Sequence, residues 1–194
     1  MNVGGDELMY PTNETVDRAL VAAQVINARK PVYGEMQAHK LAYYAQAWSL
    51  VWDGRPLFSN RIEAWRMGPV VCSLRHAFPE IRQAPPVGVF TSTEEATLGA
   101  VTDYYGDMSG VELIELTHQE GPWRETWGDR PQDAKGGDQI SLDSMRRFYT
   151  RMALRGEGPR RPMMPTVTAP DEEIARIAAD TSRRWAKTLA ILGS

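Results

Sequence analysis

The sequence predicts a mainly α-helical, compact domain with a small two-stranded β-ribbon and a tethered C-terminal helix. Apolar residues recur at helical spacing over most of the 194 residues, whereas stretches that alternate like strands are few and short. The composition, 42% apolar and 24% charged, is ordinary for a globular protein. A chain of this length accommodates one domain with a short appendage, so we expect one compact core.

Two helices are predicted at the start of the domain. From 13 to 28, apolar residues return every three or four positions behind a polar start, and Pro31 ends the segment. A second helix is predicted from about 35 to 52, and Gly54 is a natural stop for it. It is the most apolar of the predicted helices.

The β-ribbon is predicted from two short segments in the middle of the chain. Residues 61–66 alternate in polarity, and residues 87–91 form a second short strand. We expect these two to pair and to pack on helices, since an isolated ribbon of that size needs such support. Between them, Gly68-Pro69 breaks the chain, and residues 70–78 are expected to form a short helix.

Three further helices are predicted before residue 155. Residues 92–95 and 109–112 each begin with serine and end with glutamate, the spacing of a capping box at a helix start. Residues 121–139 are rich in glycine and proline, so we expect an irregular loop there, anchored by its tryptophans. The third helix follows that loop and has an apolar face. Its other face carries Arg146, Arg147, Arg151 and Arg155.

The composition changes at residue 155. Residues 155–170 contain four prolines and two glycines, which predicts a linker between a domain at 1–154 and a last helix at 171–194. An apolar stripe on a tethered helix must be buried against something, so this helix is the predicted partner-binding element. The predicted partner-binding residues are Ile174, Ile177, Thr181, Arg184, Trp185 and Leu189.

The balance of charged residues indicates which classes of partner to expect. The chain has 22 basic and 25 acidic residues, a net charge of −3, which argues against a general nucleic-acid or membrane-surface binder. Residues 146–161 contain six arginines and one acid, so a DNA-binding role for that segment stays open. No apolar run is long enough to span a bilayer, and we expect a cytoplasmic protein.

The sequence contains no recognisable catalytic motif. A glycine-rich phosphate loop, a nucleophile elbow and a zinc-protease helix are all absent, so we expect no catalytic residue and no enzyme activity. Three histidines and one cysteine leave too few ligands for a Cys/His zinc site, and we expect neither metal nor cofactor. One alternative is a hydrolase in which Cys72 and His76, four residues apart, are nucleophile and base. The apolar neighbours of Cys72 favour a core residue instead.

Several ordered strings in the chain go beyond composition. They are KLAYYAQAW at 40–48, GRPLF at 54–58, IEAWRMGPVV at 62–71 and ELTHQEGPW at 115–123, followed by the helix at 140–149. In this order they resemble the Panacea domain, also called the SocA-like or GepA-like antitoxin family. The residues that carry the resemblance, expected to build the scaffold, are Lys40, Leu41, Tyr43, Tyr44, Trp48, Glu63, Trp65, Gly68, Pro69, Thr117, His118, Pro122 and Trp123.

The resemblance implies a function. Members are small, mainly helical antitoxins of type II toxin–antitoxin modules, often carried by phages or prophages, and they neutralise a co-encoded toxin by binding it. Many of those toxins resemble translation inhibitors, including relatives of alarmone synthetases. The implied alternatives are an adaptor that delivers the toxin to a protease and a DNA-binding autoregulator of the operon; a homo-oligomer is also left open. The toxin itself is not identified by the sequence.

The six tryptophans fall into two groups, one expected in the scaffold and one expected at the partner interface. Trp48, Trp65 and Trp123 lie within the family strings and are expected to build the scaffold, and Trp52 and Trp127 lie close beside those strings. Trp185 lies on the C-terminal extension. Because buried tryptophans dominate many protein interfaces, it is the expected anchor for a partner.

Overall fold

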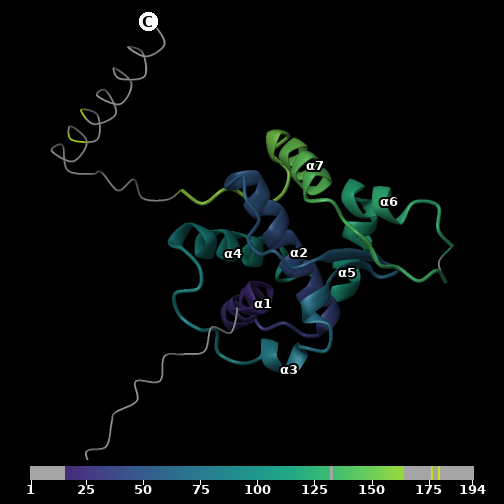
Figure 1. Ribbon diagram of the computed structural model, residues 1–194, viewed down its shortest axis with the longest axis horizontal. Helices are drawn as coiled ribbons and strands as arrows, with labels where there is room; N and C mark the ends of the chain where they lie inside the picture. The colour runs from purple at the N-terminus through teal and green to yellow at the C-terminus, as the bar shows by residue number, and fades with distance from the viewer. Residues whose placement is uncertain (1–15, 132, 164–175, 177–178, 180–194) are drawn as a thin grey trace, which may run out of the picture. The chain divides into compact units, whose positions relative to one another are not determined.

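The computed structural model describes residues 16–131 and 133–163, together with residues 176 and 179 (Figure 1). The chain divides into two units, residues 1–162 and 163–194. The described part of the first unit is the folded domain that positions the candidate site.

Most of the described domain is helical, which confirms the predicted fold class. Its seven α-helices are α1 (Arg18–Arg29), α2 (Glu35–Trp52), α3 (Phe78–Ile81), α4 (Ser92–Tyr105), α5 (Gly110–Gln119), α6 (Gly121–Trp127) and α7 (Leu142–Leu154). The other described elements are a 3-10 turn, Cys72–Leu74, and three strands, β1 (Ile62–Trp65), β2 (Gly68–Val71) and β3 (Asp138–Gln139).

Helix α2 is the central element of the domain. Its side chains are buried without interruption from Gln37 to Leu50, because α1, α4, α5, α7 and β2 all pack against it. Figure 1 shows α2 surrounded by these helices. A helix buried around its whole circumference needs an apolar or hydrogen-bonded side chain on every face. Its strongly apolar sequence largely meets this requirement. Most of its buried polar side chains are hydrogen-bonded, namely Gln37, Lys40, Gln46 and Ser49, whereas His39 Nδ1 has no partner among the described residues.

The sheet differs from the predicted ribbon. Strand β1 pairs with both β2 and β3, antiparallel in each case, in the order β2-β1-β3. The predicted second strand, 87–91, is wrong, because that segment is a loop before α4 in which Val87 is fully exposed. Trp65 pairs with Gly68, so the chain reverses within two residues and β1 meets β2 at once. Gly68 has a φ of +92°, a conformation that glycine adopts without strain.

Two other local predictions are corrected by the structure. The predicted helix over 70–78 is wrong at its start, because Val70 and Val71 complete β2 and β-branched residues favour extended backbone. The predicted loop over 121–139 contains helix α6. Pro122 lies in its first turn, where the missing N–H of a proline costs no helical hydrogen bond.

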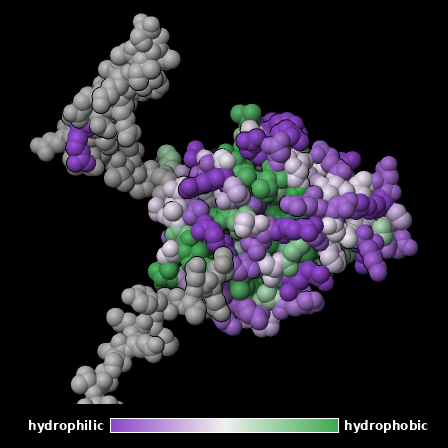
Figure 2. Space-filling model, in the orientation of Figure 1, coloured by the Kyte–Doolittle hydropathy of each residue, from purple (hydrophilic) through white to green (hydrophobic). Residues whose placement is uncertain are grey.

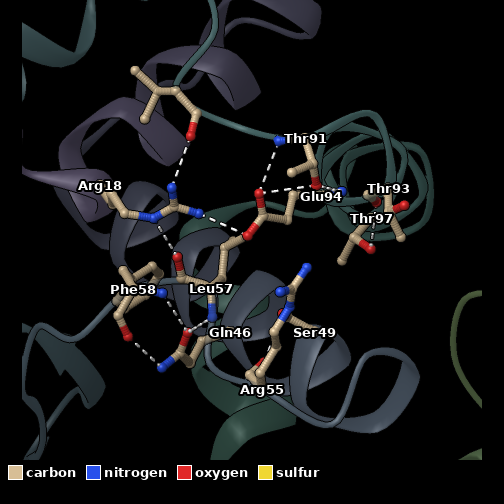
Figure 3. Close-up of polar contacts among 11 residues, drawn as sticks. Arg18, Gln46, Ser49, Arg55, Leu57, Phe58, Thr91, Thr93, Glu94 and Thr97 are labelled. Carbon is tan, nitrogen blue, oxygen red and sulfur yellow. Dashed lines mark hydrogen bonds and ion pairs between the residues drawn. The ribbon is translucent and has the colours of Figure 1, made fainter. Parts of the chain in front are cut away.

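A polar cluster joins the start of α1 to the start of α4 (Figure 3). The Arg18 guanidinium donates to the carbonyl oxygens of Leu57 (2.9 Å) and Val89 (2.7 Å) and to Glu94 Oε1 (2.8 Å). From α2, the buried Gln46 Oε1 accepts the Leu57 N–H (2.8 Å). These contacts satisfy the backbone of two loops that cross between helices, and thereby fix α1 and α4 against α2.

The start of α4 depends on a capping box. Thr91 Oγ1 accepts the Glu94 N–H (3.3 Å), and Glu94 Oε2 accepts the Thr91 N–H (2.8 Å). We expect Thr91→Ala to lower the free energy of unfolding by about 1 kcal/mol, because a helix N–H loses its acceptor. Urea unfolding measures this loss. Thr93→Ala in the first turn of the same helix is the matched control, and an equal loss in both variants would contradict the capping role.

The surface carries scattered rather than continuous apolar areas. Figure 2 shows a mostly hydrophilic face with apolar residues between the polar ones. The most exposed large apolar side chains of the described domain, such as Tyr33 (85%) and Leu154 (82%), come from different elements. Among the described helices, none is both long enough and apolar enough to cross a membrane.

Candidate functional site

The motif residues of the sequence meet where α2, the β1–β2 hairpin and the α5–α6 corner come together. Lys40 of α2 donates from Nζ to the carbonyl oxygen of Pro69 in β2 (3.0 Å). Trp123 of α6 donates from Nε1 to the carbonyl oxygen of Trp65 in β1 (2.9 Å). Gly68 lies against both α2 and α5, since a Cβ built there would be 2.7 Å from Lys40 Cε and 2.8 Å from Thr117 Oγ1. Three segments that are far apart in the sequence thus share one set of contacts.

Lys40 is a buried ammonium group at this junction. Its side chain is almost wholly inaccessible, and burial lowers its pKa to about 7. The carbonyl oxygen of Pro69 accepts a hydrogen bond from its Nζ. A lysine taken out of water is costly unless it is hydrogen-bonded. Its position in the motif therefore reflects a specific structural use, the fastening of the hairpin to α2.

Thr117 and His118 complete the junction from α5. Thr117 Oγ1 lies 2.9 Å from the carbonyl oxygens of both Leu113 and Ile114 and is held in place by them. The His118 ring stacks on the Trp123 indole with centroids 4.0 Å apart. Its pKa is lowered, first by burial and then by the charge on Lys40. His118 Nε2 is buried and has no partner in the described part of the structure.

An aromatic and cationic row continues from His118 along α6. Trp123 stacks on Trp127 with centroids 5.5 Å apart, and the Arg130 guanidinium lies over the Trp127 ring. Arg130 also pairs with Asp138 of β3, so the row is fastened to the sheet. Each ring therefore has a fixed neighbour, and the two indoles, each less than a tenth exposed, belong to the hydrophobic core.

Two hollows share the side chains of His118 and Trp123 as walls. The smaller, about 280 Å³, is also lined by Arg66, Met67 and Trp127. The larger, about 510 Å³, is also lined by Gly121, Arg124, Glu125, Gly128 and Asp129. The smaller hollow has aromatic, aliphatic and cationic walls and no acidic one, whereas the larger has charges of both signs.

The structure also has a buried carboxylate beside the motif, that of Glu120. This residue is not among those predicted from the sequence. Glu120 Oε2 accepts hydrogen bonds from Tyr149 Oη (2.6 Å) and Tyr44 Oη (3.1 Å). Tyr149 Oη also lies 3.2 Å from Tyr43 Oη; since the single proton of Tyr149 goes to Glu120, Tyr43 is the donor in that pair. Burial raises the pKa of Glu120 to about 7, against the opposing effect of the two tyrosine hydrogen bonds. Glu120 Oε1 is buried without a partner among the described residues.

Glu120 is hard to find from sequence because its string, His-Gln-Glu-Gly, looks like an exposed polar turn. The one available signal in the sequence is its place directly in front of a glycine and a proline. Three of the other motif residues, Leu41, Tyr43 and Trp48, are fully buried in the core. They support the site by packing.

The Cys72–His76 alternative gains no support from the geometry. His76 is exposed and follows the 3-10 turn with a positive φ, so the two residues do not share one helix face. Burial raises the pKa of the Cys72 thiol, and a hydrogen bond to Glu63 raises it further. An activated cysteine needs the opposite shift, toward the thiolate.

Three arginines in α7 and directly after it are paired with acids. Arg146 and Arg147 both pair with Asp143, at 2.9 and 2.7 Å, and Arg155 pairs with Glu157 at 2.8 Å. Each is an exposed pair of small energetic weight, but together they neutralise part of the positive charge available for phosphates. Within the described residues, no group of three or more histidine, cysteine, aspartate or glutamate side chains is placed to hold a metal ion.

The predicted partner-binding residues lie outside the described part of the chain. They are Ile174, Ile177, Thr181, Arg184, Trp185 and Leu189. The first residues of the predicted linker, in contrast, are described and pack on the domain: Pro159 is buried, and Gly158 approaches the Trp48 indole so closely that a Cβ there would clash with it. Arg161 also lies 3.6 Å from Asp53 at the end of α2.

Comparison with known families agrees with the motif strings. Residues 39–124 match the model of the family described as antitoxin SocA-like, Panacea domain. The match begins next to Lys40 and ends next to Trp123, so it encloses every contact of the junction described above. The resemblance inferred from the sequence is confirmed for this range. None of the curated proteins and none of the solved structures matches the chain.

Proposed function

We propose that this chain, which carries a SocA-like Panacea domain match over residues 39–124, is the antitoxin of a type II toxin–antitoxin module. It neutralises a toxin encoded beside it by binding the toxin directly. The family match is the observation that carries the proposal. The geometry supports it because the motif side chains are committed to holding α2, the hairpin and the α5–α6 corner together, as a binding scaffold requires.

The nature of the toxin is the finer part of the proposal. The resemblance implies a translation inhibitor, such as an enzyme related to alarmone synthetases, acting in the bacterial cytoplasm and encoded by a phage or prophage. The chain acts without catalysis, cofactor or metal, by covering the active site of the toxin or preventing its folding. Protease delivery and operator binding are the competing modes of action.

Co-expression with the adjacent open reading frame tests the proposal. We expect that gene product alone to arrest growth, and this chain to restore growth and to co-purify with it at a fixed ratio. Restored growth that requires a cellular protease, with loss of the toxin from the cell, would replace neutralisation by the adaptor mode. An adjacent product that is harmless, or toxic whether or not this chain is present, would end the antitoxin proposal.

The predicted C-terminal helix provides a second test. We expect Trp185→Ala, or deletion of 171–194, to weaken binding of the toxin at least tenfold while the domain stays folded, because truncating a buried interface tryptophan has a large cost. Isothermal titration calorimetry measures the change, and circular dichroism checks the fold. Lys187→Ala is the control, because a side chain two residues after Trp185 lies on the opposite side of a helix. Unchanged toxin affinity after the deletion would show that the extension is dispensable.

A further inference from the structure

The smaller hollow beside His118 has the properties of a preformed pocket for a partner side chain. It holds about 280 Å³ and is walled by Trp123, Trp127, His118, Met67 and Arg66. This volume is in the range of one large apolar side chain with part of its backbone, and less than a drug-sized ligand needs. Met67 is 38% exposed at the tip of the hairpin, which leaves an apolar rim open to a partner.

The aromatic walls of this hollow and the backbone of the hairpin are fixed before any partner arrives. Trp123 is held by its hydrogen bond to the Trp65 carbonyl and by stacking on both sides, against His118 and Trp127. The hairpin that carries Met67 is fastened to α2 by Lys40. Because ordering side chains at an interface costs free energy, walls that are already ordered favour tight binding.

The charges around the hollow indicate the chemistry of the occupant. Arg61 pairs with Glu63, and Arg130 pairs with Asp138. By contrast, Arg66 and Arg124 are exposed and form no side-chain ion pair with any of the described residues. Of these two, Arg66 lines the smaller hollow, whereas Arg124 lines the neighbouring larger one together with Glu125 and Asp129. Arg66 is therefore the uncompensated positive charge of the smaller hollow. Arginine binds carboxylates strongly and is common at the centre of interfaces.

We propose that this hollow receives a loop of the toxin that presents an apolar or aromatic side chain next to an acidic residue. The apolar side chain enters between Met67 and the two indoles, and the carboxylate pairs with Arg66. The inference rests on the proposed antitoxin function and adds to it a specific contact surface and the character of the partner's contact segment.

The test measures affinity for the purified product of the adjacent open reading frame by calorimetry, using the full chain. We expect Arg66→Glu and Met67→Asp each to raise the Kd tenfold or more, and Arg66→Lys to retain part of the affinity. Arg82→Glu, an exposed arginine at the C-terminal end of α3, is the matched charge control and is expected to change the Kd less than twofold. Both tested positions are exposed, so the variants are expected to keep the fold, which circular dichroism checks.

Hydrogen exchange and light scattering give independent readouts. We expect the backbone amides of 66–67 and 123–127 to exchange more slowly in the complex than in the free chain. Toxin binding that Arg66→Glu and Met67→Asp leave unchanged would overturn this inference while the antitoxin function stands. If the unaltered chain fails to bind the toxin, the proposed function falls and this inference falls with it. A change in the mass of the free protein in these variants would show instead that a second copy of the chain occupies the hollow.

Discussion

Gly68→Ala is expected to lower the free energy of unfolding by about 3 kcal/mol or more. A Cβ at this position would lie 2.7 Å from Lys40 Cε and 2.8 Å from Thr117 Oγ1, closer than real contacts allow. Neither neighbour moves freely, because Lys40 is buried and bonded to Pro69 and Thr117 is held by two carbonyl oxygens. Overpacking of this kind costs about 1–3 kcal/mol, and a side chain at a φ of +92° adds about 1–2 kcal/mol.

Gly54→Ala separates these two costs. Gly54 has a φ of +69°, and a Cβ placed there would have no atom within 4 Å, so only the backbone strain applies. We expect Gly54→Ala to lose about 1 kcal/mol in urea unfolding, and Gly68→Ala clearly more. Equal losses in the two variants would show that the junction yields around position 68, and would contradict its rigid packing.

We also expect Gly68→Ala to lower the affinity for the toxin. Because Gly68 lies directly after Met67, a shift of the hairpin away from α2 moves one wall of the smaller hollow. A variant that still folds but binds the toxin less tightly would connect the buried motif to the surface. Such a result would give a physical reason why these buried motif residues matter for the proposed binding of a toxin.

The central helix and the class of fold could be predicted from sequence because their signals are local. The apolar spacing from 35 to 52 indicates a helix, and the structure has α2 there, with its polar residues His39 and Lys40 buried as well. The hairpin was not predictable in the same way. Val70 and Val71 favour extended backbone, but two residues are too few to separate a strand from the start of a short buried helix. What decides is the two-residue turn that brings them against β1.

The features of the site that could not be predicted from the sequence depend on contacts between residues far apart in the chain. Glu120 acquires its character from Tyr44, 76 residues away, and from Tyr149, 29 residues away, and no local pattern marks it as buried. Gly121 and Pro122 obscure helix α6 in the sequence, because both are typical of turns although proline is also favoured at the start of a helix. The resemblance to a family therefore singled out the motif residues, while the electrostatics of the site required the fold.

Glu120→Gln is expected to change how the stability of the domain depends on pH. The pKa of Glu120 is about 7 in the folded chain and about 4.5 when unfolded. Between these values the folded state keeps a proton that the unfolded state has lost, so the Glu120 contribution to stability is complete below pH 4.5 and declines as the pH rises to 7. At about 1.4 kcal/mol per pKa unit, the full decline is on the order of 3 kcal/mol.

Glutamine has nearly the same shape and does not titrate, so the variant lacks this decline. Its carbonyl oxygen still accepts from Tyr44 and Tyr149, and its amide nitrogen takes the place of the unpartnered Oε1. We therefore expect Glu120→Gln to gain stability relative to the unaltered chain as the pH rises from 4.5 to 7. Urea unfolding at a series of pH values measures the difference.

Comparing the free energy of unfolding of Glu120→Gln with that of the unaltered chain separates the contribution of Glu120 from that of the other buried groups. The groups facing it, Tyr43 and Tyr44 from α2, Tyr105 from α4 and Tyr149 from α7, all have pKa values raised above the ordinary range and stay neutral. Lys40 makes its own contribution, because its pKa is about 7 when folded and 10.5 when unfolded, so that stability rises with pH above 7. That contribution is common to both proteins and cancels.

Glu115→Gln on the exposed face of α5 is the matched control for the loss of one negative charge. We expect its free energy of unfolding to differ from that of the unaltered chain by a constant amount, with no added change between pH 4.5 and 7. Parallel curves for Glu120→Gln and the unaltered chain would mean that Glu120 is ionised in the folded domain as readily as in water. In that case the two tyrosine hydrogen bonds would outweigh the cost of burying the carboxylate, and the junction would hold a stable negative charge beneath α6.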